Sequence, residues 1–333
     1  MRRVTVLAVT CALAGGAVGS LACTSLLGLH ELAVRDSDAS TDDVGVAPPV
    51  DAGEDADGCA PRGTSYCAKL CPVPDFCDDF DDETLAFDRW KGAPGLPNQV
   101  VTLEGGLALI PDEKGGQALL AMAHSDTSTP AITLLTESMT APPGAKPRGL
   151  RVRVEARLKD LIFAKPEAGP GDQYFYYFAV ADPVRGEGIA MVLRDKGASA
   201  TSLVLQQREI SSRGKEIDLA RLLNVDTISL TQNWIGIELV LAPPDVLRDL
   251  KIPCTVVDAN LDPIPDADAI ARAPAGGLRI VGRVATESRC VLMFDELATG
   301  DWLGRAALAV GATVSDFGTA NTRIDNFSAS FLY

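Results

Sequence analysis

Residues 150–159 read Leu150, Arg151, Val152, Arg153, Val154, Glu155, Ala156, Arg157, Leu158 and Lys159. Apolar residues take every second position, and charged residues take the positions between them. Because successive side chains of a β-strand point to opposite faces, this period of two predicts a strand with one face in a core and one in water. This stretch is the clearest fold signal in the chain.

Shorter runs of the same kind continue from residue 76 to the end of the chain, separated by Gly, Pro, Asp and Asn. They lie at 99–110, 117–124, 131–139, 173–182, 188–194, 202–210, 234–242, 254–259, 277–284, 289–297, 305–314 and 322–333. Many short strands at this spacing are typical of a β-sandwich or barrel. Helical patterns are limited to 216–223 and 244–250, and Pro243-Pro244 keeps the second one short. We therefore expect one all-β domain over 76–333.

The ends and the middle of this region carry motifs of one fold family. Phe76–Asp82, followed by Trp90, resembles the opening of concanavalin A-like jelly rolls, a superfamily that includes laminin-G-like domains and family 16 glycoside hydrolases. Asn233–Leu239 resembles their central strand, and Arg323–Ala329 resembles their closing strand. The resemblance implies a jelly-roll β-sandwich of roughly 12–15 antiparallel strands, in which the first and last strands pair.

The N-terminus has the composition of an export signal. Two arginines precede the uncharged run Val4–Ala22, which is too short and too rich in small residues for a permanent membrane span. We expect a signal peptide over residues 1–22. Ser20-Leu21-Ala22-Cys23 resembles a bacterial lipobox, which implies that Cys23 is lipidated and anchors the chain to a bilayer through its acyl chains. Ser20 stands where that motif usually has Leu, and the same residues fit an ordinary signal peptidase site, so a secreted or periplasmic protein is the alternative.

The cysteine count favours lipidation. The eight cysteines are Cys11, Cys23, Cys59, Cys67, Cys71, Cys77, Cys254 and Cys290. Cys11 leaves with the signal, and a lipidated Cys23 leaves an even set that can pair completely in an oxidising compartment. Thr24 follows Cys23 in place of the Asp that retains many bacterial lipoproteins in the inner membrane. We therefore expect an exported protein at the outer membrane or cell surface.

Residues 23–58 form an acidic segment. Eight acidic residues and no basic residue lie between Asp36 and Asp57. Such a segment buries too little apolar surface to offset chain entropy, so we expect a disordered tether. Residues 84–333 carry 25 Lys/Arg and 30 Asp/Glu, so their net charge is only −5 of the total −15. The chain lacks the basic surface that nucleic-acid binding requires.

Four cysteines, Cys59, Cys67, Cys71 and Cys77, fall within 19 residues. Their spacing lacks the paired C-x-x-C pattern of zinc sites. In an exported chain, two disulfides across a short neck, residues 59–77, are the better interpretation, and three pairings remain open. The remaining cysteines predict a third disulfide, Cys254–Cys290, within the main domain.

No complete catalytic motif is present, so we assign no catalytic residues. Family 16 hydrolases carry a strand motif E-x-D-x-x-E, and here Glu216 and Asp218 match while Arg221 replaces the final Glu. Retaining hydrolysis needs two carboxyl groups, and an arginine does not exchange a proton near neutral pH. His124 lies among strand residues and is better interpreted as a packed or surface side chain than as a base.

Calcium is the cofactor that the resemblance suggests, because concanavalin A-like domains often hold a structural calcium ion near the joined ends. Asp79 and Asp82 at the start and Asp325 at the end are the candidate ligands. Carboxylate oxygens are the donors that calcium prefers. The alternative is a solvated acidic turn.

A glycan platform is the candidate ligand site. Tyr174 and Tyr176 share one face of an aromatic run, and Arg151 and Arg153 supply planar polar groups. Core packing of the tyrosines is the alternative. We therefore expect a non-catalytic, envelope-anchored module that binds a glycan or a surface protein. The alternatives are a glycan-active hydrolase or lyase with an atypical carboxylate pair, and a purely structural envelope lipoprotein.

Overall fold

The computed structural model describes residues 62–81, 89–93, 96, 106–113, 115–126, 131–162, 173–195, 201–209, 216–224, 233–258, 261–265, 267–268, 277–284, 287–293, 295–314 and 318–333. The expected signal peptide 1–22, the lipid site Cys23, the tether 23–58 and Cys59 lie outside these residues. Within the described ranges, no helix has the length and hydropathy needed to cross a bilayer.

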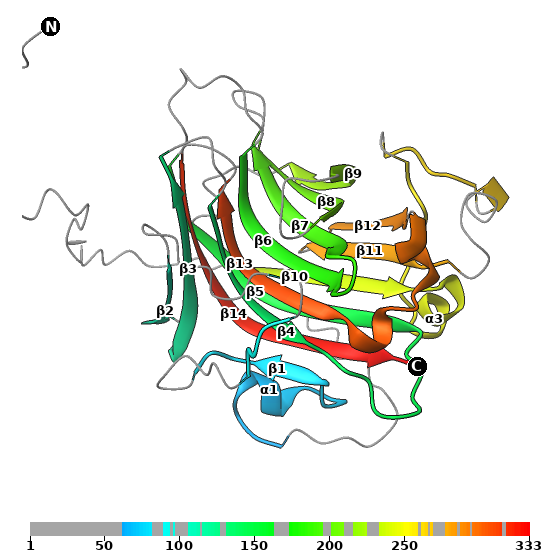
Figure 1. The fold of residues 1–333 in the computed structure, drawn as a ribbon, viewed down its shortest axis with the longest axis horizontal. Helices are drawn as coiled ribbons and strands as arrows, with labels where there is room; N and C mark the ends of the chain where they lie inside the picture. Colours follow the sequence, from blue (N-terminus) through cyan, green and yellow to red (C-terminus); the bar gives the residue numbers. More distant parts are fainter. Residues whose placement is uncertain are drawn as a thin grey trace, which may run out of the picture. The chain divides into compact units, whose positions relative to one another are not determined.

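Two antiparallel sheets build the described part of the chain (Figure 1). The eight-stranded sheet runs in the order β12 (Glu287–Leu292), β11 (Arg279–Val284), β10 (Ile235–Ala242), β5 (Gly149–Ile162), β14 (Gly318–Leu332), β3 (Gln117–Ser125) and β2 (Gly106–Pro111), with β1 (Phe76–Asp78) also paired to β14. The six-stranded sheet runs in the order β4 (Ala131–Ser138), β13 (Ala307–Val314), β6 (Gln173–Asp182), β7 (Glu187–Asp195), β8 (Thr201–Glu209) and β9 (Glu216–Asn224). The prediction of an all-β sandwich of roughly 12–15 antiparallel strands is confirmed, with 14 strands among the described residues.

The first and last strands pair side by side, as the resemblance implies. β1 pairs antiparallel with β14 over Phe76–Asp78. The ring of Trp90 packs against Phe76 and Phe327, with ring centroids 4.9 and 5.2 Å apart. Its indole Nε1 donates a 2.7 Å hydrogen bond to Asp78. Burial raises the pKa of Asp78 above its usual value. The hydrogen bonds from the Phe80 backbone and Trp90, together with the charge of Arg89, oppose this shift. Asp78 is therefore a structural anchor of the joined ends.

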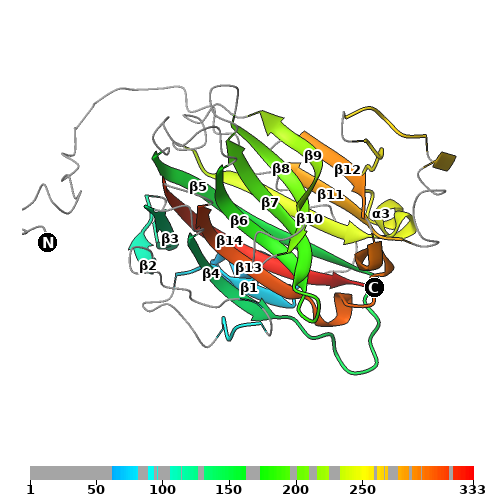
Figure 2. The same cartoon turned by 45° about the horizontal axis from the view of Figure 1, so that its top comes forward.

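The alternation in β5 sorts its side chains between two environments. Leu150, Val152 and Val154 lie in the main core, which also contains Leu308 and Val310 of the six-stranded sheet. The charged residues between them, Arg151, Arg153 and Glu155, therefore face away from the six-stranded sheet. We call this side of the eight-stranded sheet its outer face. Figures 1 and 2 show β10, β5 and β14 side by side across the middle of this sheet.

One of the two helical expectations is wrong. Residues 216–223 form β9, which pairs with β8. The register of this pair shifts twice, between Leu203 and Val204 and between Leu205 and Gln206. These β-bulges let residues three apart on β9, Leu219 and Leu222, both be buried, which imitates helical spacing. The second expectation holds, since α3 spans Pro244–Asp249.

A strand expected at 254–259 is reduced to two isolated bridges. Val256 bridges to Cys290 of β12, and Val257 bridges to Pro263. Pro263 has no backbone N–H, so the ladder cannot continue through it. The segment is held at the edge of the sheet by the disulfide Cys254–Cys290.

The neck residues that the structure describes form a short helix and a disulfide. The helix α1 spans Tyr66–Lys69, and the Ser65 hydroxyl caps its N-terminus. Cys67 pairs with Cys77 of β1, and Cys71 is also in a disulfide. The neck is therefore tied to the strand that flanks β14.

Candidate binding face

A row of polar side chains crosses the outer face of the eight-stranded sheet at right angles to its strands. The register places Ser288 of β12 opposite Arg283 of β11, Arg283 opposite Glu238 of β10, and Glu238 opposite Arg153 of β5. Arg153 in turn lies opposite Ser328 of β14. We call these five residues the polar row.

Glu238 is the centre of this row. Its Oε1 accepts hydrogen bonds from Nε of Arg151 and, at 2.8 Å, from Nε of Arg153, while its Oε2 accepts from Nη1 of Arg283 at 3.1 Å. The Glu238 side chain is 11% exposed, and those of the three arginines are 26–32% exposed. We call these four residues the Glu238 cluster. It joins three strands through one carboxylate.

The electrostatics of the cluster keep Glu238 ionised. Burial by itself would raise the pKa of this carboxyl, but the charges and hydrogen bonds of Arg151 and Arg153 lower it from 4.5 to about 2. Burial lowers the pKa of Arg151, and Glu238 opposes that shift. The cluster therefore holds three cations around one carboxylate in a partly buried place.

A pair of carboxyl groups lies beside the row, at a bulge in β14. Asp325 of β14 is the cross-strand partner of Glu155 in β5, and the register shifts between Asp325 and Ser328. Asn326 lies in the bulge with a left-handed backbone, φ 52°. Its backbone N–H donates to Asp325 at 2.7 Å, and its side-chain amide donates to Glu155 at 2.9 Å. One residue therefore orients both carboxyl groups.

The pKa of Asp325 is raised from 3.8 to about 7. Burial is the main cause, and the carboxylates of Glu155, Asp112 and Asp81 raise it further, while the Asn326 hydrogen bond opposes the shift. Asp325 therefore keeps its proton up to near-neutral pH.

The neck contacts the far end of the polar row. The hydroxyl of Tyr66 in α1 hydrogen-bonds to Ser328 at 3.1 Å. Cys77 of β1 is the cross-strand partner of the same serine. Burial raises the pKa of Tyr66, so this phenol stays protonated. The Cys67–Cys77 disulfide thus bounds one end of the face.

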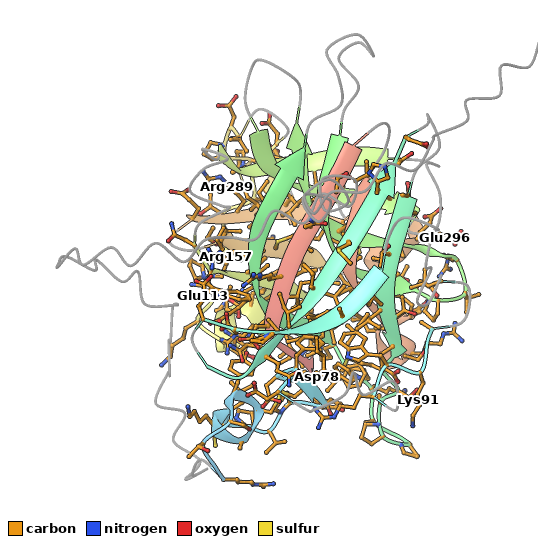
Figure 3. The ribbon with its side chains drawn as sticks, turned by 90° about the vertical axis from the view of Figure 1, so that its left-hand side faces the viewer. Asp78, Lys91, Glu113, Arg157, Arg289 and Glu296 are labelled. Carbon is orange, nitrogen blue, oxygen red and sulfur yellow. A yellow bond between two sulfur atoms is a disulfide. The ribbon has the colours of Figure 1, made fainter. Side chains whose placement is uncertain are left out.

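A second ion pair lies on the same face, toward β2. Arg157 donates to Glu113 at 2.8 Å, and Figure 3 shows the two residues side by side. Arg323 lies 3.9 Å from the same carboxylate. Arg157 is thereby engaged away from the Glu238 cluster.

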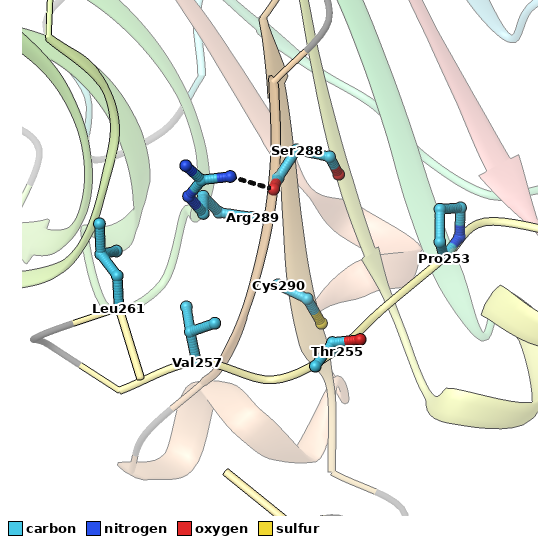
Figure 4. A pocket seen from close by; sticks show the side chains of 7 residues that line it. All are labelled: Pro253, Thr255, Val257, Leu261, Ser288, Arg289 and Cys290. Atoms are coloured by element: carbon cyan, nitrogen blue, oxygen red, sulfur yellow. Dashed lines mark hydrogen bonds between the residues drawn. The ribbon is translucent and has the colours of Figure 1, made fainter. Parts of the chain in front are cut away.

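A half-open cavity of about 320 Å³ adjoins the other end of the row. Its lining consists of Pro253, Thr255, Val257, Leu261, Ser288, Arg289 and Cys290 (Figure 4). Arg289 donates to the Ser288 carbonyl at 2.9 Å and lies 3.1 Å from Glu287. Ser288 belongs to both the row and the lining of the cavity, so the two adjoin at this residue.

The structure separates the residues of the expected glycan platform. Arg151 and Arg153 both lie in the Glu238 cluster. Tyr174 and Tyr176 lie in β6 of the six-stranded sheet. Since the outer face turns away from that sheet, the tyrosines and the arginines are not brought together.

The expected calcium ligands do not form a site among the described residues. Asp79 is buried, Asp325 lies at the β14 bulge, and Asp82 is outside the described part of the chain. Asp81 accepts a 2.9 Å hydrogen bond from the Gln117 backbone. The described ranges contain no group of three His, Cys, Asp or Glu residues arranged to hold a metal ion. Because Asp82 lies outside the described residues, the expected set of ligands is not tested as a whole, and calcium stays a prediction from sequence.

The residues that resemble catalytic motifs lie away from the polar row. Glu216, Asp218 and Arg221 belong to β9, an edge strand of the six-stranded sheet. His124 lies in β3, and its Nδ1 is 2.6 Å from the Thr319 hydroxyl.

Sequence reasoning missed the residues that organise the face, above all Glu238 and Arg283. Glu238 is the one charged residue of β10, a strand that is otherwise apolar or glycine. That isolated charge is a signal in the sequence, but its partners come from strands 45 to 87 residues away. Only strand pairing reveals them. The same holds for Glu155, which has no recognisable partner until β14 is placed beside β5.

No family model and no curated protein matches the sequence. Solved structures with a related arrangement include the cellulose induced protein Cip1, with a TM-score of 0.40 and 13% identity over 77% of this chain and 96% of that chain. An endo-β-1,4-glucuronan lyase from the fungus Trichoderma reesei has a TM-score of 0.37 and 8% identity over 72% of this chain and 93% of its own. An endo-1,3-β-glucanase from Streptomyces sioyaensis has a TM-score of 0.35 and 11% identity over 77% and 95%.

Proposed function

We propose that this chain is a non-catalytic glycan-binding module of the cell envelope and that the polar row is its binding face. The observation that carries the proposal is the row itself, which aligns polar side chains of five neighbouring strands on one partly exposed face.

The dimensions and chemistry of the row suit an oligosaccharide. Neighbouring strands lie about 4.8 Å apart, so five strands span about 19 Å. Guanidinium groups offer several N–H donors in one plane, and serine hydroxyls both donate and accept. Sugar hydroxyls need both kinds of partner. The cavity at Ser288 extends the face at one end, and Tyr66 bounds the other end.

Binding of the full chain to an array of neutral and acidic oligosaccharides tests this function, and we expect binding to a subset. Arg283→Ala should weaken that binding about ten- to hundredfold, because a charge-assisted hydrogen bond contributes on the order of 1.5–3 kcal/mol. Arg148→Ala is the matched control, since Arg148 pairs with one exposed carboxylate, Asp245, outside the row. A chain that binds no glycan on the array would refute the function. Equal binding by Arg283→Ala and Arg148→Ala would show that the polar row is not the binding face.

Envelope anchoring through Cys23 is part of the proposal and is tested separately. Metabolic labelling with palmitate should mark the wild-type chain and leave Cys23→Ala unlabelled. The support is the even number of cysteines that lipidation leaves, together with the disulfides Cys67–Cys77 and Cys254–Cys290. Equal label in both chains would indicate plain secretion.

A second candidate function is glycan cleavage, and one observation favours it. Glu155 and Asp325 are direct cross-strand partners, and such pairs have Cβ atoms about 4.5–5.5 Å apart. Retaining glycosidases place their two carboxyl groups about 5–5.5 Å apart, and these two side chains start from neighbouring positions on adjacent strands. Asp325, with its pKa of about 7, would be the acid, and Glu155 would be the nucleophile. New reducing ends or unsaturated sugars released from a bound glycan, and lost in Glu155→Gln, would establish this function.

A further inference from the structure

We propose that the Glu238 cluster recognises an acidic group, a carboxylate or sulfate, carried by one sugar of the bound glycan. This inference rests on the binding function proposed above and names the chemistry of its ligand. The cluster would hold the acidic sugar, and the neutral polar groups on either side would hold its neighbours.

The unused donors of the cluster are the first support. Each arginine has five N–H donors. Arg151 and Arg153 each use only their Nε toward Glu238, and Arg283 uses only Nη1. Among the described residues, the Nη groups of Arg151 and Arg153 have no acceptor. These paired Nη groups form the planar fork that binds carboxylate or sulfate oxygens in a bidentate manner.

Glu238 is the positioning residue of this arrangement. By accepting both Nε groups on one oxygen, it holds two adjacent guanidinium groups in fixed orientations before a ligand arrives. Its own carboxylate is 11% exposed and therefore offers little surface to a ligand. Preorganised donors lose less conformational entropy on binding than free side chains do.

Charge balance is the second support. The cluster holds three guanidinium groups and one carboxylate, an excess of two positive charges on side chains that are only about a quarter to a third exposed. Arg157 is engaged by Glu113, and Glu155 and Asp325 are oriented by Asn326. An anion at the Nη groups would balance the excess at a place where water screens it only in part.

The surroundings favour an acidic sugar over a free anion. On both sides of the cluster the row continues with hydroxyl groups, Ser288 toward the cavity and Ser328 with Tyr66 toward the neck. A small anion would leave the half-exposed Ser288 unused, whereas Ser328 is buried and already hydrogen-bonded to Tyr66.

The experiment titrates the full chain with two acidic oligosaccharides, a hexagalacturonate and a sulfated galactan hexamer. Each is compared with its own neutral counterpart, carboxyl-reduced or desulfated. We expect at least one acidic chain to bind about tenfold or more tightly than its counterpart, with affinity falling as salt rises. Arg153→Lys keeps the charge but removes the fork, and it should lose most of the preference for the acidic chain over its neutral counterpart.

The matched control is Arg148→Lys, which should keep the preference. If all four oligosaccharides bind equally, the glycan-binding function stands and the acidic-group inference is wrong. If none of the four binds and the chain also binds no oligosaccharide on the array, the proposed glycan-binding function is wrong. If Arg153→Lys and Arg151→Lys keep the preference for the acidic chain as fully as Arg148→Lys does, the cluster does not bind the acidic group.

Discussion

Glu238→Ala should lower the free energy of unfolding by about 3–5 kcal/mol, the usual cost of removing one partner from a buried charge cluster. The substitution leaves Arg151, Arg153 and Arg283 close together without their shared carboxylate. Urea denaturation at neutral pH should show the loss as a lower midpoint with an unchanged slope.

The control for this prediction is Glu296→Ala. Glu296 is 77% exposed and pairs with Arg185, so its loss should cost no more than about 1 kcal/mol. Equal midpoints for the two variants would contradict the central role of Glu238. Acid provides an independent check. Because the folded pKa of Glu238 is about 2 against 4.5, its contribution is present above pH 4.5 and is lost as the pH falls toward 2.

Asp325→Asn should raise the free energy of unfolding at pH 8. It should also remove a pH dependence of stability whose sign is opposite to that caused by Glu238. The folded pKa of Asp325 is about 7 against 3.8, so the folded state binds a proton that the unfolded state has released between these values. Wild-type stability should therefore fall as the pH rises from about 4 to 7, by up to roughly 4 kcal/mol. Asparagine keeps the oxygen that accepts from the Asn326 N–H and carries no charge.

Urea denaturation from pH 4 to pH 8 measures this effect in both chains. The difference in the free energy of unfolding between wild type and Asp325→Asn should be close to zero at pH 4 and greatest at pH 8. Asp301→Asn, at an exposed position, is the control and should follow the wild type. Identical pH profiles for wild type and Asp325→Asn would show that Asp325 is ionised throughout, and the acid role in glycan cleavage would then lose its support.

The two carboxyl groups show how one sheet face can treat the same chemical group in opposite ways. Glu238 has two arginines of the neighbouring strand beside it, and their charges exceed the cost of its burial. Asp325 has carboxylates as its charged neighbours, and burial is not compensated. The difference comes from cross-strand neighbours, because both residues lie on the same face of the same sheet.

Local sequence pattern was sufficient wherever burial follows a period of two. The alternation of residues 150–159 predicts the two environments of β5. The pattern misled at 216–223, because two bulges in the β8–β9 pair change its phase and make a strand imitate a helix. A bulge depends on the partner strand, which a local pattern does not contain.

The sequence by itself determined the fold class, the pairing of the first and last strands, and which face of β5 lies in the core, because each depends on local alternation or on motifs at known places. Only the tertiary structure decided which charged residues meet. Glu238 reaches arginines 85 and 87 residues earlier and 45 residues later, and Asp325 reaches Glu155 across 170 positions. Strand register sets these encounters, and register is a property of the assembled sheet.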